Sequence, residues 1–205
     1  MNWKEFLKEK RNKIELVVTL FFLAVVLVSL ANFLNFAEAR QGVVLPDPIL
    51  NLFNPIDLTW LIFALIYISL VVAIITLIKN PKQLMFAIQV YSLMVAVRIA
   101  AMYLLPLEPP AKMIILNDPF VEFFGTGQTL TKDLFFSGHT ATLLILFLVS
   151  EKQIIKIVFL ISTIAVAISV LLQHVHYTID VFAAVFFTYA CYKILNYFRL
   201  GENLK

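Results

Sequence analysis

The sequence predicts an all-α polytopic membrane protein, a bundle of six transmembrane helices with both termini in the cytoplasm. Of its 205 residues, 61% are hydrophobic and 14% are charged, whereas an average soluble domain has about 45–50% apolar and roughly 25% charged residues. The mean hydropathy is +0.92. The apolar residues form six long runs, and most of the 16 basic residues flank one side of them. We therefore expect residues 1–205 to form a single transmembrane domain.

The composition also excludes other classes of protein. A water-soluble fold of this size could not bury so large an apolar excess. Nucleic-acid binding is not expected, because the net charge of +3 is not gathered into a basic face. The single cysteine, Cys191, rules out an internal disulfide and a cysteine-based zinc site.

The first predicted span covers residues 14–36 and follows a basic segment that includes Lys10, Arg11 and Lys13. A span needs about 20 apolar residues to cross roughly 30 Å of hydrocarbon, and it must be helical because lipid offers no hydrogen bonds to the backbone. Ala37-Glu38-Ala39 has the small-x-small pattern of a cleavage site, so a signal peptide is the alternative. The apolar run is longer than the usual ~7–15 residues of a signal peptide, so we expect the span to be retained.

The second and third spans, 58–78 and 84–105, are joined by a connection that contains Lys79 and Lys82. The last three spans are 135–150, 157–173 and 178–198, and Lys152 and Lys156 lie between the fourth and the fifth. The positive-inside rule places these basic connections and both termini in the cytoplasm. The first, third and fifth connections then face the exoplasm.

The third connection, 106–134, is the longest. It opens with Pro106, Pro109 and Pro110, which resist helix formation. Further along, Asn117-Asp118-Pro119 and Gly125 are typical of the start and the end of a short helix. We expect this helix to lie along the exoplasmic membrane surface or to plug the top of the bundle.

Four ionisable residues fall near the exoplasmic ends of their spans, where charge is costly and therefore indicates function. Arg98 lies about 10 Å inside the third span, His139 opens the fourth, and His176 and Asp180 open the sixth. His176 and Asp180 are four residues apart, so a helix would place them on one face. The Asp180 carboxylate could accept a hydrogen bond from one ring nitrogen of His176 and leave the other nitrogen free as a nucleophile.

His139 would approach from another helix, in the segment Ser137-Gly138-His139-Thr140. Gly138 permits a close approach of the backbone to a ligand, and the start of a helix suits an anion such as phosphate. A nucleophilic histidine, an aspartate, a second histidine as acid and base and a cation together indicate phosphoryl transfer.

Structural roles are the alternative for some of these groups. A histidine at a helix end is usually an interfacial side chain, which is the interpretation we favour for His174. Arg98 could bind phosphate or simply pair with Asp180. A transporter or scaffold is a further alternative, but transporters place polar groups at the membrane midplane, whereas here they gather near one face.

The two histidine segments resemble the sphingomyelin synthase branch of the type-2 phosphatidic-acid phosphatase superfamily. That branch has a block Cys-Gly-Asp-x-x-x-Ser-Gly-His-Thr, matched here from Asp133 to Thr140 with Thr131 and Lys132 in place of Cys-Gly. Its later block, His-Tyr-Thr-x-Asp-Val, is matched from His176 to Val181. Weaker similarities are found at Leu45-Pro46-Asp47 and at Arg98 with Tyr103.

The resemblance implies an enzyme that needs no metal and no cofactor. It makes His176 the nucleophile that takes the phospho-headgroup, Asp180 the residue that orients it, and His139 the acid that protonates the departing diacylglycerol. A ceramide-like or diacylglycerol-like hydroxyl would then displace the headgroup, phosphocholine or phosphoethanolamine, from the phospho-histidine. The partners are therefore a phospholipid donor and a lipid acceptor. The expected substrate-binding residues are Arg98, Ser137, Gly138, Thr140, Asp133, Tyr103, Tyr177 and Asp47.

The departures from the superfamily favour a transferase. Its lipid phosphatases use a Lys-x6-Arg-Pro block and a Ser-Arg pair before the last histidine, whereas here Ser169 precedes Val170 and no such block occurs. Arg98 would replace the missing arginine. Water could still intercept the phospho-histidine, which would make the same site a phosphatase. We expect the bacterial cytoplasmic membrane rather than a Golgi or plasma membrane.

Overall fold

The computed structural model describes residues 2–117 and 130–203, and this part of the chain is helical with no strand. The short helix predicted near 117–125 falls mostly within 118–129 and lies outside the described residues. One isolated parallel bridge joins Val43 to Leu107. The helices are α1 (Trp3–Phe6), α2 (Lys10–Ala39), the 3-10 turn η1 (Leu50–Leu52), α3 (Thr59–Leu77), α4 (Pro81–Leu104), α6 (Gly138–Val149), α7 (Gln153–Leu172) and α8 (Thr178–Asn203).

Five of these helices are long and apolar enough to cross a membrane, namely α2, α3, α4, α7 and the part of α8 from Thr178 to Arg199. The prediction of six full spans is not confirmed, because α6 has only 12 residues and is therefore about 18 Å long. Residues 135–137 precede it as a loop instead of extending the helix. Arg98 donates to the Phe136 carbonyl of that loop, and the Ser137 N–H donates to the Asp180 carbonyl; partners of this kind are the condition for irregular chain inside a bundle.

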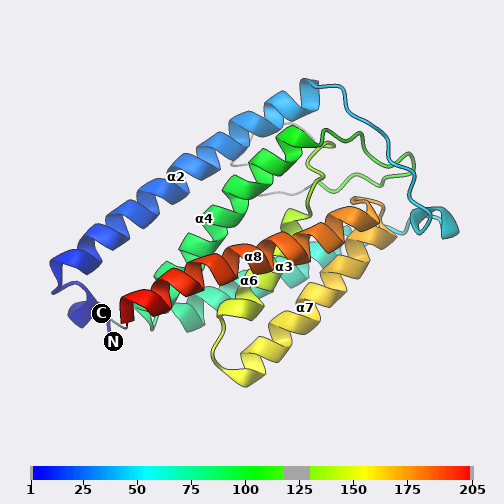
Figure 1. Cartoon of the computed structure of the whole chain (residues 1–205). Coiled ribbons are helices and arrows are strands. Elements are labelled where there is room, and N and C mark those ends of the chain that lie inside the picture. Colours follow the sequence, from blue (N-terminus) through cyan, green and yellow to red (C-terminus); the bar gives the residue numbers. More distant parts are fainter. Residues whose placement is uncertain (1, 118–129, 204–205) are drawn as a thin grey trace.

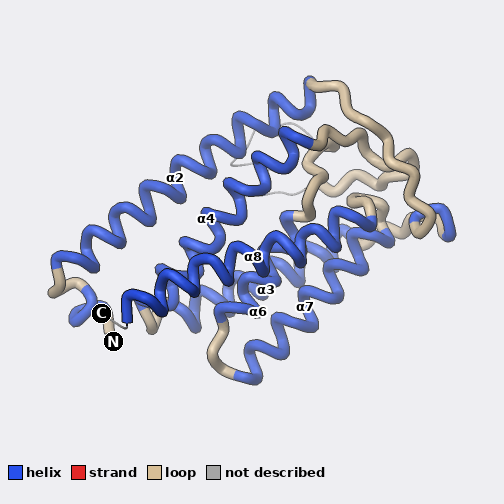
Figure 2. Tube along the Cα trace, viewed as in Figure 1, coloured by secondary structure: helices blue, strands red, loops and turns tan. Residues whose placement is uncertain are grey.

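The helices run back and forth between two ends of the molecule. The start of α2 and the end of α8 lie at the same end, whereas most of the long connections gather at the other end (Figures 1 and 2). In Figure 1, α2 lies beside α4, and α6 is the short helix near the middle. It contacts α4, α7 and α8, while α3 contacts α7. The short helix is thus surrounded by longer ones.

The largest core cluster lies where α4, α6, α7 and α8 meet, with Val90, Ala141, Val166 and Ala184 fully buried within it. The outward faces of the long helices remain apolar. Phe21 on α2 is 69% exposed and Phe186 on α8 is 70% exposed. Large exposed apolar surfaces of this kind are unusual in soluble monomers and fit contact with lipid chains.

Candidate active site

The segment before α6 is held in place by Arg98 of α4. The Arg98 Nε donates to the carbonyl oxygen of Phe136 at 2.5 Å, and Nη1 lies 2.8 Å from Oδ1 of Asp133. The Arg98 Nη2 also donates to the Asp133 carbonyl at 3.4 Å. The ion pair predicted as one alternative, between Arg98 and Asp180, is therefore not the one formed, because Arg98 pairs with Asp133 and Asp180 contacts His176.

A second anchor ties the same segment to α8. The backbone N–H of Ser137 donates to the carbonyl oxygen of Asp180 at 3.1 Å. Ser137 is the N-cap of α6, and its hydroxyl accepts from the N–H of Thr140 at 3.4 Å. These two bonds bring the first turn of α6, which carries His139, against the start of α8.

His176 and Asp180 form a buried pair at that start. The His176 Nδ1 lies 3.3 Å from Oδ2 of Asp180, and the same oxygen accepts the N–H of Tyr177 at 3.0 Å. Helix α8 begins only at Thr178, so the carboxylate reaches back from the first turn, as the third residue of a capping box does. Among the described residues, nothing hydrogen-bonds the buried Nε2 of His176.

The second imidazole lies beside the first. The ring centroids of His139 and His176 are 6.0 Å apart and the rings are inclined by 63°. His176 is fully buried, whereas His139 is partly exposed. Two histidines from different parts of the chain therefore meet in one place, with an aspartate behind one of them.

A cavity of about 880 Å³ leads to His139. One end of it is polar, where Arg98, Asp133 and His139 line it together with Gly138. Most of the remaining lining is apolar, and most of it comes from α2, α3, α4 and α6. The described lining includes Val175 but not His176. The cavity thus reaches the first imidazole, and the second lies behind its wall.

Gly138 lets the guanidinium pack directly on the first turn of α6. A Cβ at this position would lie 3.2 Å from Cζ of Arg98 and 3.3 Å from its Nη1. The N-terminal N–H groups of a helix favour anions, so a cation and a helix start converge at this point. The neighbouring Thr140 is fully buried, and its hydroxyl has no partner among the described residues.

Asp47 and Tyr177, which the sequence places among the substrate-binding residues, serve here to fasten connections. Burial opposes the ionisation of Asp47, yet hydrogen bonds from Thr178, Leu50 and Ile49 hold the pKa of its carboxyl below the usual value. The N–H of Thr178 lies 2.6 Å from its Oδ2. Neither Asp47 nor Tyr177 is among the described residues that line the cavity.

Tyr177 joins three connections. Its hydroxyl donates to the carbonyl oxygen of Glu108 at 2.9 Å and accepts the N–H of Leu45 at 3.3 Å. Burial raises the pKa of this phenol, so the hydroxyl keeps its proton. The residue beside the candidate nucleophile is therefore fixed by hydrogen bonds at its far end.

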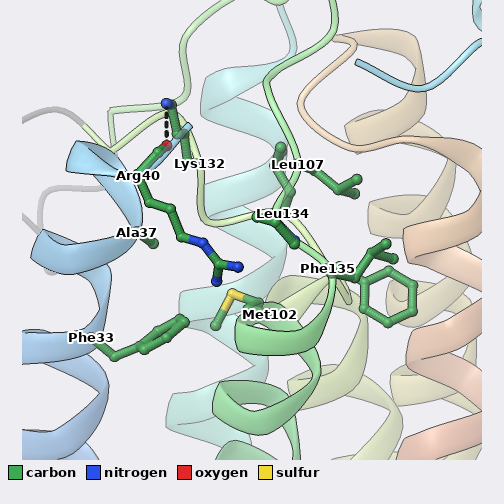
Figure 3. A pocket seen from close by; sticks show the side chains of 10 residues that line it. Phe33, Ala37, Arg40, Met102, Leu107, Lys132, Leu134 and Phe135 are labelled. Atoms are coloured by element: carbon green, nitrogen blue, oxygen red, sulfur yellow. Dashed lines mark hydrogen bonds between the residues drawn. The ribbon is translucent and has the colours of Figure 1, made fainter. Parts of the chain in front are cut away.

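Tyr103 lies on the rim between α2 and α4, where its ring centroid is 5.2 Å from the Arg40 guanidinium. Lys132 donates to the Arg40 carbonyl at 2.8 Å, the bond dashed in Figure 3, and to Glu108 at 2.8 Å. Hydrogen bonds from the Lys132 ammonium and from the Gly42 N–H hold the pKa of the Glu108 carboxyl below its usual value.

The pocket in Figure 3 has a volume of about 10 Å³, which is room for roughly one water. The contacts of this rim hold the segment before α6.

Sequence reasoning missed several side chains of the cavity. Tyr67, Tyr91 and Thr142 line it, but they come from three helices and share no local motif. Only the packing of those helices brings them together. Among the residues that the structure describes, no group of three or more histidine, cysteine, aspartate or glutamate side chains could hold a metal ion.

Comparison with protein families gives one match. Residues 132–197 match the family model described as PAP2 superfamily C-terminal. This segment contains Asp133, the first turn of α6 and the His176–Asp180 pair, and it excludes Arg98. The match supports a relationship with the type-2 phosphatidic-acid phosphatase superfamily, whose members are generally phosphatases or phosphotransferases. No curated protein and no solved structure matches the chain significantly.

Proposed function

We propose that this chain is an integral-membrane lipid phosphotransferase that moves a phosphocholine or phosphoethanolamine headgroup from a glycerophospholipid to a lipid hydroxyl. One observation carries the proposal. The buried Nε2 of His176, backed by Asp180, has no partner among the described residues, and the His176 ring lies beside His139, which lines the polar end of a mostly apolar cavity. The match of residues 132–197 supports the same class of chemistry.

In the first step, Nε2 of neutral His176 attacks phosphorus and forms a P–N bond. The bond between phosphorus and the glycerol oxygen breaks, and its electron pair goes to that oxygen, which takes a proton from His139. Asp180 accepts the hydrogen bond of Nδ1–H and stabilises the positive charge on the ring. The products of this step are diacylglycerol and a phospho-histidine that carries the headgroup.

In the second step, His139 is neutral and removes the proton from an incoming lipid hydroxyl. That oxygen attacks phosphorus, the P–N bond breaks, and its electrons return to His176. Arg98 and the N–H groups at the start of α6 stabilise the phosphoryl oxygens in both steps. Ser137, Gly138, Thr140 and Asp133 shape this anion site.

The geometry sets one requirement for this mechanism. The His139 ring lines the cavity, whereas the His176 ring is not among its described lining residues. The His139 side chain must therefore turn, so that the phosphorus can reach Nε2 of His176. Side-chain rotations of this kind are common when a ligand binds.

A lipid phosphatase is the second candidate, with water in place of the lipid hydroxyl. The family match favours it, because the superfamily takes its name from phosphatases. The apolar lining around the site favours a lipid hydroxyl over water as the acceptor. The two functions differ in their products, which are a new phospholipid or phosphosphingolipid for the transferase and a freed phospho-headgroup or phosphate for the phosphatase.

The distribution of basic residues supports a topology with six crossings, with both termini in the cytoplasm and the site near the exoplasmic surface. We infer a bacterial cytoplasmic membrane. In this arrangement α6 completes one crossing together with the loop that precedes it. We assign Asp47 and Tyr177 to the positioning of α8 rather than to substrate binding.

The test uses the purified protein in detergent with headgroup-labelled phosphatidylcholine or phosphatidylethanolamine and with ceramide or diacylglycerol as the acceptor. Chromatography of the products should reveal a new labelled lipid. His176→Ala should abolish it while the helical circular dichroism is unchanged. His174→Asn is the matched control, since His174 has a left-handed backbone (φ 57°) that asparagine tolerates. Full activity of His176→Ala would refute the assignment.

A further inference from the structure

The cavity extends far from the catalytic end. On α4 its lining begins at Arg98 and continues to Leu84, a distance of about 21 Å at 1.5 Å per residue. This is roughly two thirds of the hydrocarbon thickness of a membrane, about 30 Å. The side chains that line its far part are Leu70, Ala73, Ile74, Leu77, Leu84 and Ala87, all apolar.

The volume of the cavity fits a lipid rather than a small polar ligand. A cavity of about 150 Å³ holds benzene, with its six carbon atoms. At the same cavity volume per non-hydrogen atom, the 880 Å³ of this cavity would hold about 35 non-hydrogen atoms. Among the lining residues that the structure describes, the charged groups lie at one end only. An amphiphile with an anionic head and long apolar chains has this distribution of polarity.

The cavity also opens sideways. Leu27 on α2 and Val71 and Ile74 on α3 line it, yet each keeps between 41% and 57% of its surface exposed. These three side chains would face the lipid if α2 and α3 cross a membrane. A lipid could therefore enter between these two helices without leaving the hydrocarbon.

We propose that an acyl chain of the substrate lies along α4 in this cavity, and that the far end of the cavity determines which chain lengths are accepted. The proposal rests on the proposed function for the position of the headgroup at Arg98 and His139. Ala73 and Ala87 are small and buried at the far end, which leaves room there for the end of a chain. A larger side chain in this part would shorten the space.

A matched pair of substitutions isolates this role. Ile74 and Ile75 are neighbours on α3, and each is 57% exposed, but only Ile74 is among the described residues that line the cavity. Both variants, Ile74→Trp and Ile75→Trp, should fold, because each side chain is more than half exposed and not packed in the core. Only Ile74→Trp adds bulk to the cavity.

The measurement compares kcat/KM for dioleoyl- and dioctanoyl-phosphatidylcholine. Ile74→Trp should lower the ratio of long-chain to short-chain activity by at least about fivefold, the lower bound for overpacking a fitted space. Ile75→Trp should leave the ratio within about twofold of the wild type. Equal ratios in the two variants, with activity retained, would overturn the proposal.

A second measurement does not depend on turnover. In the His176→Ala background, with the native Trp3 and Trp60 replaced by phenylalanine, phosphatidylcholine with brominated acyl chains is added to detergent micelles at low mole fraction, and tryptophan fluorescence is recorded. Quenching of Trp at the Ile74→Trp position should saturate, whereas at Ile75→Trp it should rise only in proportion to the lipid. Saturable quenching, together with the absence of any labelled lipid product from the wild-type protein, would support the acyl site and reject the proposed function. Identical quenching curves would reject the acyl site.

Discussion

Replacement of Arg98 by methionine tests how the site is held together. The guanidinium is 5% exposed and the Asp133 side chain 25% exposed, so the variant leaves a largely buried carboxylate without its partner. Removal of one partner of a buried ion pair costs about 3–5 kcal/mol. The carbonyl of Phe136 loses its charged donor as well, which alone is worth about 1.5–3 kcal/mol. Because Asp133 is partly open to water, we expect a total loss of about 3–5 kcal/mol.

The assay is equilibrium unfolding in mixed micelles of a mild detergent and dodecyl sulfate, followed by circular dichroism. Asp133→Asn in the Arg98→Met background removes the uncompensated charge, so the double variant should recover about 1–3 kcal/mol. Arg40→Met is the control, because Arg40 stacks on Tyr103 at the rim and should cost about 1 kcal/mol or less. A loss below about 1 kcal/mol for Arg98→Met, or strictly additive effects in the double variant, would refute the reasoning.

Two further predictions concern single positions. Asp47→Asn should destabilise the fold by about 1–3 kcal/mol, the cost of weakened buried hydrogen bonds. Its folded pKa is lowered, so its contribution is present above the usual value of about 3.9 and is lost as the pH falls through the lower folded pKa. The thermal unfolding midpoints of the wild type and of Asp47→Asn should therefore converge at acidic pH. A difference between the two midpoints that stays constant with pH would contradict this. Gly138→Ala should lower kcat by about tenfold or more, because the new Cβ shifts the Arg98 guanidinium. The free energy of unfolding should change little, and a kcat equal to that of the wild type would contradict this prediction.

The long helices could be predicted from the sequence because they depend on local composition. The predicted span 58–78 corresponds to α3, Thr59–Leu77, and 84–105 to α4, which starts earlier because Pro81 suits the first helical turn. Helix α2 extends beyond 14–36 at both ends, since a helix continues past its apolar run into polar residues. For these elements, hydropathy and end signals carry most of the information.

Tertiary contacts account for what the sequence could not show. The apolar Phe135 and Phe136 were predicted to be helical, but the chain there is a loop, because Arg98 takes the Phe136 carbonyl and Ser137 caps α6. The sequence suggested Asp180 as an ion-pair partner of Arg98, whereas the packing of the chain pairs Arg98 with Asp133. The contact between His176 and Asp180 could be foreseen because it is local.

The central claim is that His176 carries the headgroup in a covalent intermediate. The most direct measurement is rapid quenching of the purified protein with phosphate-labelled phosphatidylcholine, in the absence of acceptor, into alkali that preserves phospho-histidine. Peptide mass spectrometry should then locate the added phospho-headgroup on the peptide that contains His176, and His176→Ala should remove it. Label on a different residue, or product formed on the same timescale without any labelled protein, would contradict the account.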